Sequence, residues 1–498
     1  MKLPLLIFAF SLIGTCAASA ITVENTAGSL SEKISDKTIT SLTVTGTLNA
    51  ADFDFISSSL PELTTLDMAA AQIEPYAGAT VLTSVSTSEA NRLPHNALMG
   101  MSKLAAVKLP ASLTAIGDAS LASTAITSIS IPATVTAIGD GAFSGCDALT
   151  SVTVPEAVTD MGSHTFMGCT SLAKATVNAD IDSIGASTFA RCTALTDVSV
   201  NTTVRAIGKR AFAGCTSLAA FSFPRALTLI APEAFEASGL ETVDLSLSAS
   251  LDSIGPWSFA RCPNLTSVTL PAELQRIGEG AFFDDNRLED YTGPETLLSI
   301  APYTFKGDNA INTAALLPEG VESVGEYAFT GLNHISTFAL PSSLAYIGNN
   351  AFEGWTSLST LDAMGLDDVP ELGENVWLGV NQPGTTLNVK GETADMFKAA
   401  PQWKEFNIMF VSATTPNTIE DKTSVDARFS GYDLIIKSNV NILSASLYDS
   451  TGIRHAYVEP DDTELTIDTS DLASRIFIVK LALEDGSQPS VKVARRNP

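Results

Sequence analysis

Apolar residues recur along the middle of the chain with a constant period, and the same kinds of residue return in the same order. In a first series, a large apolar residue precedes Gly, Ala or Pro every 22 to 24 residues. Its members are Leu93, Ile116, Ile138, Met161, Ile184, Ile207, Ile230, Ile254, Ile277, Ile300, Val324 and Ile347. A second series in the same register consists of Phe143, Phe166, Phe189, Phe212, Phe235, Phe259, Phe282, Phe305, Phe329 and Phe352. Two series in one register indicate a tandem repeat, and we expect Trp377 to take the Phe position of a last, degenerate unit.

Each repeat begins with a turn. In the unit that starts at Ile138, Gly139 favours a tight turn. Ala142, Phe143 and Cys146 follow at helical spacing. This half of the unit predicts one short helical or 3₁₀ turn with Phe143 in the core.

A short strand completes the repeat. Val152 and Val154 alternate with Ser151 and Thr153, which predicts a strand with its apolar side chains inward, and Pro155 ends it. One unit cannot bury its apolar face alone, but stacked units share a continuous core. The repeats therefore predict an α/β solenoid of about 23-residue units with a parallel sheet.

The repeated Ile-Gly, Ala-Phe, Cys, Leu, Val and Pro positions resemble those of the BspA-like leucine-rich-repeat surface proteins of Gram-negative gut and oral bacteria. The resemblance covers about residues 90–410, and residues 390–408 are similar to the segment that closes such arrays. A cap is also required physically, because a terminal strand edge would otherwise be exposed. We expect the solenoid with its C-terminal cap over residues 93–410. The N-terminal cap over residues 21–92 should contain irregular strands that bury Leu42, Val44, Leu63, Leu66 and Met68. The resemblance implies a leucine-rich-repeat protein associated with adhesion to host surfaces and proteins.

The first twenty residues have the features of a signal peptide. Lys2 supplies a positive charge, residues 3–13 are apolar, and Ala18 and Ala20 are the small residues that precede a cleavage site. We expect cleavage after Ala20 and export, to the outside or to the outer-membrane surface. The alternative is a lipoprotein signal with Cys16 as the lipidated residue. No later stretch is long and apolar enough to predict a transmembrane helix.

The C-terminal residues predict a separate small domain. Residues 411–425 have the composition of a linker. Residues 426–498 contain alternating runs at 432–436, 442–448 and 476–483, which are typical of an antiparallel β-sandwich. The segments 447–452, 467–472 and 477–481 resemble a C-terminal sorting domain of type IX secretion, although Arg475 stands where that family usually has Gly. This resemblance implies the secretion machinery as a partner, in addition to the one implied by the signal peptide.

The charge balance excludes some partners. The 498 residues contain 28 Lys and Arg against 55 Asp and Glu, for a net charge of −27. Nucleic acids and anionic lipids bind basic surfaces, so we expect neither as a direct partner.

Candidate chemistry is sparse. Cys146, Cys169, Cys192, Cys215 and Cys262 fall at one repeat position, where other units carry Ser238, Asp285, Asp308, Leu332 or Trp355. Buried thiols explain this pattern best, and disulfides between stacked neighbours remain the alternative. The doublets Asp284–Asp285 and Asp461–Asp462 are interpreted as solvated loop carboxylates. We find no catalytic constellation and expect no metal, no cofactor and no enzyme activity.

The outward strand positions form the surface where a protein of this shape would bind. The small or hydroxylated pairs along it are Ala106 and Lys108, Ser128 and Ser130, Ser151 and Thr153, Lys174 and Thr176, Asp197 and Ser199, Ala220 and Ser222, Thr242 and Asp244, Ser267 and Thr269, Asp290 and Thr292, Thr337 and Ala339, and Thr360 and Asp362. The preference of exposed sheets for Thr explains most of these choices without any ligand. The candidate ligand-binding residues are the larger side chains Lys174, Asp197, Asp244, Asp290 and Tyr291.

The sequence predicts an exported binding or adhesion protein that recognises a protein or glycan at the cell surface, with host surfaces among the candidates. Two alternatives are a structural envelope protein without a specific ligand, and an enzyme with a site in the irregular segments around residues 21–92 or 365–390. Clustered, strongly perturbed carboxylates in a cleft of those segments would favour the enzyme.

Overall fold

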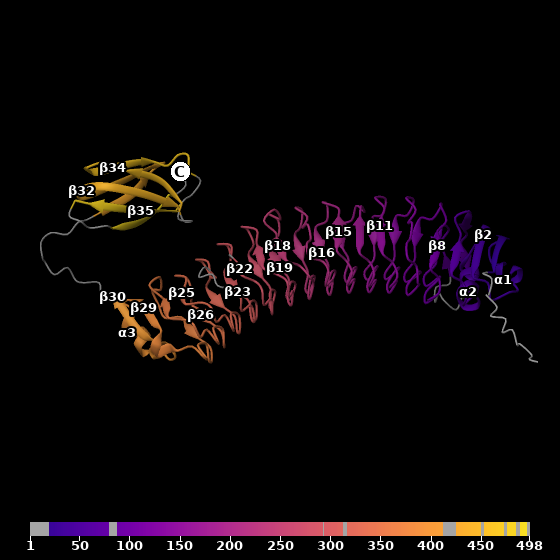
Figure 1. The fold of residues 1–498 in the computed structure, drawn as a ribbon, viewed down its shortest axis with the longest axis horizontal. Coiled ribbons are helices and arrows are strands. Elements are labelled where there is room, and N and C mark those ends of the chain that lie inside the picture. Colours follow the sequence, from indigo (N-terminus) through magenta and orange to yellow (C-terminus); the bar gives the residue numbers. More distant parts are fainter. Residues whose placement is uncertain are drawn as a thin grey trace, which may run out of the picture. The chain divides into compact units, whose positions relative to one another are not determined.

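The computed structural model describes residues 19–78, 87–291, 293–311, 316–411, 425–449, 453–472, 476–484 and 489–495. The chain forms two compact units, Met1–Ala413 and Thr414–Pro498, which run from indigo to orange and from orange to yellow in Figure 1. Most of the expected signal peptide and linker, at residues 1–18 and 412–424, lies outside the described residues. Within the described ranges, no helix has the length and hydropathy needed to cross a bilayer.

The first unit is a solenoid built on a column of parallel strands, which we call the long-strand column (Figure 1). Equivalent residues of successive turns lie opposite one another, as in the register Val152, Ala175 and Val198. This confirms the predicted solenoid and its parallel sheet. The strands of this long-strand column are β1 (Ala20–Asn25), β2 (Ser41–Leu48), β3 (Thr65–Asp67), β8 (Ala106–Lys108), β11 (Ser151–Val154), β13 (Lys174–Val177), β15 (Asp197–Val200), β18 (Thr242–Asp244), β20 (Ser267–Thr269), β22 (Asp290–Tyr291), β25 (Thr337–Ala339), β27 (Thr360–Asp362), β29 (Thr386–Lys390) and β30 (Asn407–Val411).

A second parallel column, absent from the prediction, lies at the Ile-Gly positions. Its strands contain only two residues, and their Ile side chains are buried. They are β7 (Arg92–Leu93), β9 (Ala115–Ile116), β10 (Ala137–Ile138), β12 (Asp160–Met161), β14 (Ser183–Ile184), β16 (Ala206–Ile207), β17 (Leu229–Ile230), β19 (Ser253–Ile254), β21 (Arg276–Ile277), β23 (Ser299–Ile300), β24 (Ser323–Val324), β26 (Tyr346–Ile347) and β28 (Glu371–Leu372). Near the N-terminus, β4 (Ala71–Ile73) pairs with β2, and β5 (Tyr76–Ala77) pairs with β6 (Thr87–Ser88).

The turns are not helical, so the predicted helical or 3₁₀ turn is wrong. Gly141 and Gly145 have φ of +59° and +69°, and their amides donate to the carbonyl oxygens of Ser163 and Met167, each at 2.8 Å. The Phe143 amide likewise donates to the carbonyl oxygen of Thr165, at 2.9 Å. Stacking in register brings these carbonyls within reach, so alternate amides bond to the next turn and a helix does not form.

Gly139 also has a different role from the one predicted. Its φ is not positive. A Cβ at this position would lie 2.6 Å from the Asp118 backbone nitrogen in the preceding turn. The glycine is therefore needed for the close approach of two turns, since any side chain there would meet backbone.

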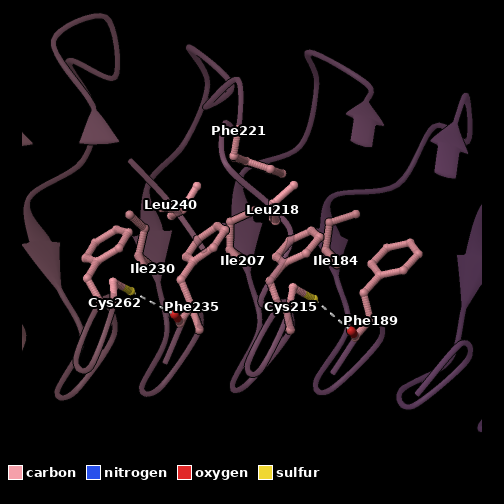
Figure 2. Close-up of a cluster of buried hydrophobic side chains, with 14 of the residues drawn as sticks. Ile184, Phe189, Ile207, Cys215, Leu218, Phe221, Ile230, Phe235, Leu240 and Cys262 are labelled. Atoms are coloured by element: carbon pink, nitrogen blue, oxygen red, sulfur yellow. Dashed lines mark hydrogen bonds between the residues drawn. The ribbon is translucent and has the colours of Figure 1, made fainter. Parts of the chain in front are cut away.

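The core is a column of stacked aromatic rings. The ten Phe residues of the repeat are fully buried, and neighbouring rings lie 5.1–5.8 Å apart at 3–12°. Figure 2 shows Phe189 and Phe235 in this column, with Ile184, Ile207 and Ile230 beside them. Trp377 continues the column, 5.0 Å from Phe352 at 10°, as predicted for the last unit.

Helices occur at the two ends of the solenoid. The first two turns contain α1 (Leu30–Lys33) and α2 (Ala50–Ser59). The strands there are regular, because β1, β2, β3 and β8 pair in register, so the expectation of irregular strands is wrong. The apolar residues predicted to be buried there are buried. At the other end, η1 (Gln382–Gly384), α3 (Ala394–Ala399) and η2 (Trp403–Glu405) precede β30, and the Trp403 ring packs 5.4 Å from Trp377.

The second unit is antiparallel, as predicted. It contains β31 (Val425–Ser430), β32 (Asp433–Asp449), β33 (Arg454–Val458), β34 (Asp462–Asp468), β35 (Ile476–Leu483) and β36 (Ser490–Ala494). The first part of β32 pairs with β31 and β34, and its last part pairs with β33 and β35. One long strand thus pairs with four others of a six-stranded sheet, and the unit has a separate core that includes Leu434, Leu447 and Phe477. Arg475 lies outside the described residues.

Candidate functional site

The predicted outward residues lie on the exposed face of the long-strand column. In β11, for example, Ser151 and Thr153 are exposed while Val152 and Val154 are buried. The pairs Ser128 and Ser130, and Ala220 and Ser222, are also exposed, but their segments are not strands. Thr292 lies outside the described residues. We call this surface the strand face.

Two of the predicted site residues form a pair on the strand face. Lys174 of β13 lies opposite Asp197 of β15, and its Nζ is 2.7 Å from Asp197 Oδ2. Their side chains are 60% and 56% exposed. An exposed pair of this kind contributes about 0–1 kcal/mol to stability.

The predicted candidates Asp244 and Asp290 lie further along the same face. Asp244 Oδ1 accepts hydrogen bonds from the hydroxyl and the backbone amide of Ser246, at 2.6 and 3.0 Å. These bonds lower the pKa of Asp244 below its ordinary value. Asp290 is exposed and borders a surface hollow of about 500 Å³ together with Ser267 and Thr269.

Tyr291 does not belong to the exposed surface, which corrects its selection as a ligand-binding candidate. Its side chain is 2% exposed, and its ring lies 4.4 Å from that of Phe305. Burial raises the pKa of its hydroxyl. The alternation of the strand explains the position, because Asp290 points outward and the next residue must point inward.

A cluster of aromatic residues on the turns was not anticipated. It contains Trp257, Phe283, Tyr303 and Tyr327, which are all partly exposed. The Trp257 ring lies 5.2 Å from that of Phe283 and 6.3 Å from that of Tyr303, and Tyr303 stacks on Tyr327 at 5.3 Å. We call these four residues the turn-face cluster.

Cations and backbone strain accompany the turn-face cluster. Lys306 Nζ lies 4.3 Å from the ring centre of Tyr327, and the Arg261 guanidinium lies 5.3 Å from that of Phe283. Trp257, Tyr303 and Tyr327 have φ of +56°, +59° and +54°. Bulky residues rarely adopt this conformation, which the equivalent residues of other units share, among them Gly141, Gly280 and Asn350. Their spacing, with Gly280 between Trp257 and Tyr303, is the sequence signal that could have revealed the cluster.

The five cysteines of the repeat are buried and unpaired. All five are free thiols, so the alternative of disulfides between stacked neighbours is not observed. Each thiol donates to the carbonyl oxygen at the Phe position of the preceding turn, as Cys215 does to Phe189 at 3.1 Å and Cys262 to Phe235 at 3.3 Å (Figure 2). This agrees with their interpretation as core residues. Over the described ranges, no three His, Cys, Asp or Glu side chains are grouped so that they could hold a metal ion.

The interpretation of Asp285 as a solvated loop carboxylate is wrong. Asp285 and Asp308 are both fully buried, at the repeat position that the cysteines occupy elsewhere. The register of the repeat explains this, because every residue at that position points into the core.

A comparison with one solved structure agrees with this architecture. A leucine-rich-repeat protein from Bacteroides ovatus is 23% identical, with a TM-score of 0.59 over 74% of this chain and 87% of its own. A leucine-rich cell-surface protein from Faecalibacterium prausnitzii is 22% identical over 57% of this chain and 86% of its own, with a TM-score of 0.32. The pneumococcal vaccine antigen PcpA is 14% identical over 75% and 80% of the two chains, with a TM-score of 0.37. No curated protein matches the chain in sequence.

The family assignment rests on the repeat itself. The family model described as the BspA type leucine rich repeat region matches six copies, over residues 74–196, 182–312 and 308–382. These matches extend over more than half of the 498 residues. The chain therefore belongs to the BspA-type leucine-rich-repeat family.

Proposed function

We propose that this protein is an exported, non-catalytic binding protein that recognises a protein or glycan at the cell surface. The observation that carries the proposal is the long, in-register strand face, which repeats small polar side chains turn after turn. Membership of a family of bacterial surface type supports this role. A structural envelope protein without a specific ligand is the second candidate, because sheet preference for Ser and Thr explains much of the face.

Two surfaces are available for recognition. The strand face presents the Lys174–Asp197 pair, and the turn-face cluster presents Trp257 and Tyr303. Tyr, Trp and Arg are the residues that most often dominate binding energy in protein interfaces, which favours the turn-face cluster for a protein partner.

The proposal includes no catalytic site. The two carboxylates with strongly raised pKa, Asp285 and Asp308, are buried in the array. They are outside residues 21–92 and 365–390, where an accessible cluster would favour an enzyme.

The experiment is a binding screen of the mature protein against host matrix proteins and glycans at several salt concentrations. Salt is varied because the net charge of −27 promotes weak ionic contacts at low ionic strength. The double variant Lys174→Ala, Asp197→Ala tests the strand face. Trp257→Gly with Tyr303→Gly tests the turn face, because two units already carry a glycine at that repeat position, Gly141 and Gly280, with positive φ. A salt-resistant hit that one variant removes supports binding at that face, and no hit favours the structural role.

Export and sorting belong to the same proposal. The signal-like residues 1–20 and the antiparallel C-terminal unit are proposed to direct the chain to the outside, the latter as a sorting domain of type IX secretion. Protease added to intact cells should degrade the solenoid. Complete protection would contradict surface exposure.

A further inference from the structure

The column that carries the cysteines contains a second kind of polar residue in two consecutive turns. The thiols of Cys169, Cys192 and Cys215 each donate to the Phe carbonyl oxygen 26 residues earlier, at 3.1 Å. Trp355 uses its indole N–H for the same bond, to Phe329 at 2.8 Å. The Cys and Trp side chains at this position therefore donate a hydrogen bond to the Phe carbonyl oxygen of the preceding turn. Asp285 and Asp308 occupy the same position.

The two aspartates change the hydrogen bonds of the turns around them. The Cys215 amide donates to Phe212 of its own turn at 3.2 Å. In contrast, the Cys262 amide donates to Asp285 Oδ1 at 2.6 Å, and the Asp285 amide donates to Asp308 Oδ1 at 2.8 Å. One carboxyl oxygen of each aspartate is thus satisfied by an amide of the preceding turn.

The other carboxyl oxygens are buried without a partner. Asp285 Oδ2 and Asp308 Oδ2 accept no hydrogen bond. Nor does any donor within the described part of the chain reach the carbonyl oxygens of Phe259 and Phe282, which lie 26 residues before the two aspartates. Each aspartate therefore leaves two buried acceptors without a donor: its own Oδ2 and the Phe carbonyl oxygen 26 residues earlier. A proton on each Oδ2 supplies the missing donor.

Among the described residues, no Lys, Arg or His pairs with Asp285 or Asp308 to stabilise an ionised form. The charges that act on Asp285 are those of Asp308 and Asp284, and Asp284 also acts on Asp308. Cys262 is the titratable side chain at the same position of the preceding turn. The following turn places Leu332 at the column position. Neither aspartate forms an ion pair with a cation of the described residues. Desolvation raises the pKa of both carboxyl groups, and for Asp285 the charge of Asp308 adds to this effect. Burying an unpaired charge is costly, so the neutral form is favoured.

We propose that Asp285 and Asp308 are carboxylic acids in the folded protein, and that each donates its Oδ2 proton to the Phe carbonyl oxygen of the preceding turn. This part of the array is then a pH-sensitive element. The two groups are neutral in the folded state, but above the ordinary value of 3.8 they ionise in the unfolded chain. The folded state binds more protons, so their contribution to stability falls as pH rises above that value.

Infrared difference spectroscopy on the intact protein tests the protonation state directly. At pH 8 the wild type should show a carboxylic-acid C=O band that shifts in D₂O, and Asp285→Asn with Asp308→Asn should remove it. Asp290→Asn, which removes an exposed carboxylate of a neighbouring strand, should leave the band in place. Absence of the band from folded wild-type protein at pH 8 overturns the proposal.

Urea unfolding between pH 5 and pH 9 tests the consequence. The Asn side chains keep an acceptor for the amide and a donor for the Phe carbonyl, so the midpoint of the double Asn variant should fall less with pH than that of the wild type. Asp285→Cys with Asp308→Cys, which introduces the residue that five other turns carry at this position, should behave in the same way up to pH 8 and serves if the Asn variant does not fold. Equal pH dependence in the wild type and a folded variant overturns the proposal.

Discussion

The indole N–H of Trp355 donates to the carbonyl oxygen of Phe329 at 2.8 Å, where other turns of the array use a cysteine thiol. Both residues are fully buried. Residues as different as Cys and Trp therefore satisfy the same kind of backbone acceptor.

Replacing Trp355 by Phe should destabilise the solenoid by about 1–3 kcal/mol, because the Phe329 carbonyl oxygen loses its donor in a buried environment. Urea unfolding followed by circular dichroism measures the change. Leu378→Ala, at a side chain that is 52% exposed, serves as the control and should change the free energy of unfolding by less than about 0.5 kcal/mol. Equal effects of the two substitutions would contradict the role of the bond.

Phe212→Ala should cost about 3–5 kcal/mol, moderated by local collapse of the array. Its ring contacts Phe189 at 5.4 Å and Phe235 at 5.1 Å, so the substitution interrupts the aromatic column at one turn. Tyr346→Ala, at a side chain that is 41% exposed, is the matched control. A loss below about 0.5 kcal/mol for Phe212→Ala in urea unfolding would show that the ring does not support the core.

Two glycines of the turns should differ in their tolerance of alanine. A Cβ at Gly255 would lie 2.6 Å from the Ile230 carbonyl oxygen, which cannot rotate away, and the cost should be about 3 kcal/mol. Gly214 has φ of +72°, but its nearest neighbours would be 3.7 Å from a Cβ, and Arg191 and Arg261 occupy the same position in other turns. Gly214→Ala should therefore cost only about 1 kcal/mol. Thermal and urea unfolding compare the two variants, and the reverse order would refute the close-approach argument.

The carboxyl group of Asp67 should titrate below its ordinary value of 3.8. Lys108 Nζ donates to its Oδ2 at 2.7 Å, and the Ala69 amide donates to its Oδ1 at 3.1 Å; these two bonds lower the pKa. The stabilising contribution is present above the unfolded pKa and is lost as pH falls through the lowered one. Carbon-detected NMR titration measures the value, and Lys108→Met should raise it. Lys103→Met, which removes a cation paired with Glu62, should leave the pKa of Asp67 unchanged.

The repeat alone was sufficient to predict the solenoid and its core. A side chain that returns every 22 to 24 residues occupies one place in every turn, so Phe143 and its equivalents had to share one environment, and Trp377 could be assigned to it. The same logic correctly placed Ser151 and Thr153 on the outside. It would also have placed Tyr291 and Asp285 inside, had the period been preferred to the polar character of each residue.

The hydrogen bonds between turns were decided only by tertiary structure. The Gly141 amide donates to the carbonyl oxygen of Ser163, 22 residues later, and the Cys262 amide donates to the carboxyl group of Asp285, 23 residues later. Such partners are set by how closely two turns stack, and the hydrophobic pattern contains no information on that distance. For the same reason the sequence did not reveal the two-residue strands or the non-helical turns. Local patterns specify which way a side chain points, whereas its partner belongs to another turn that only the folded array brings near.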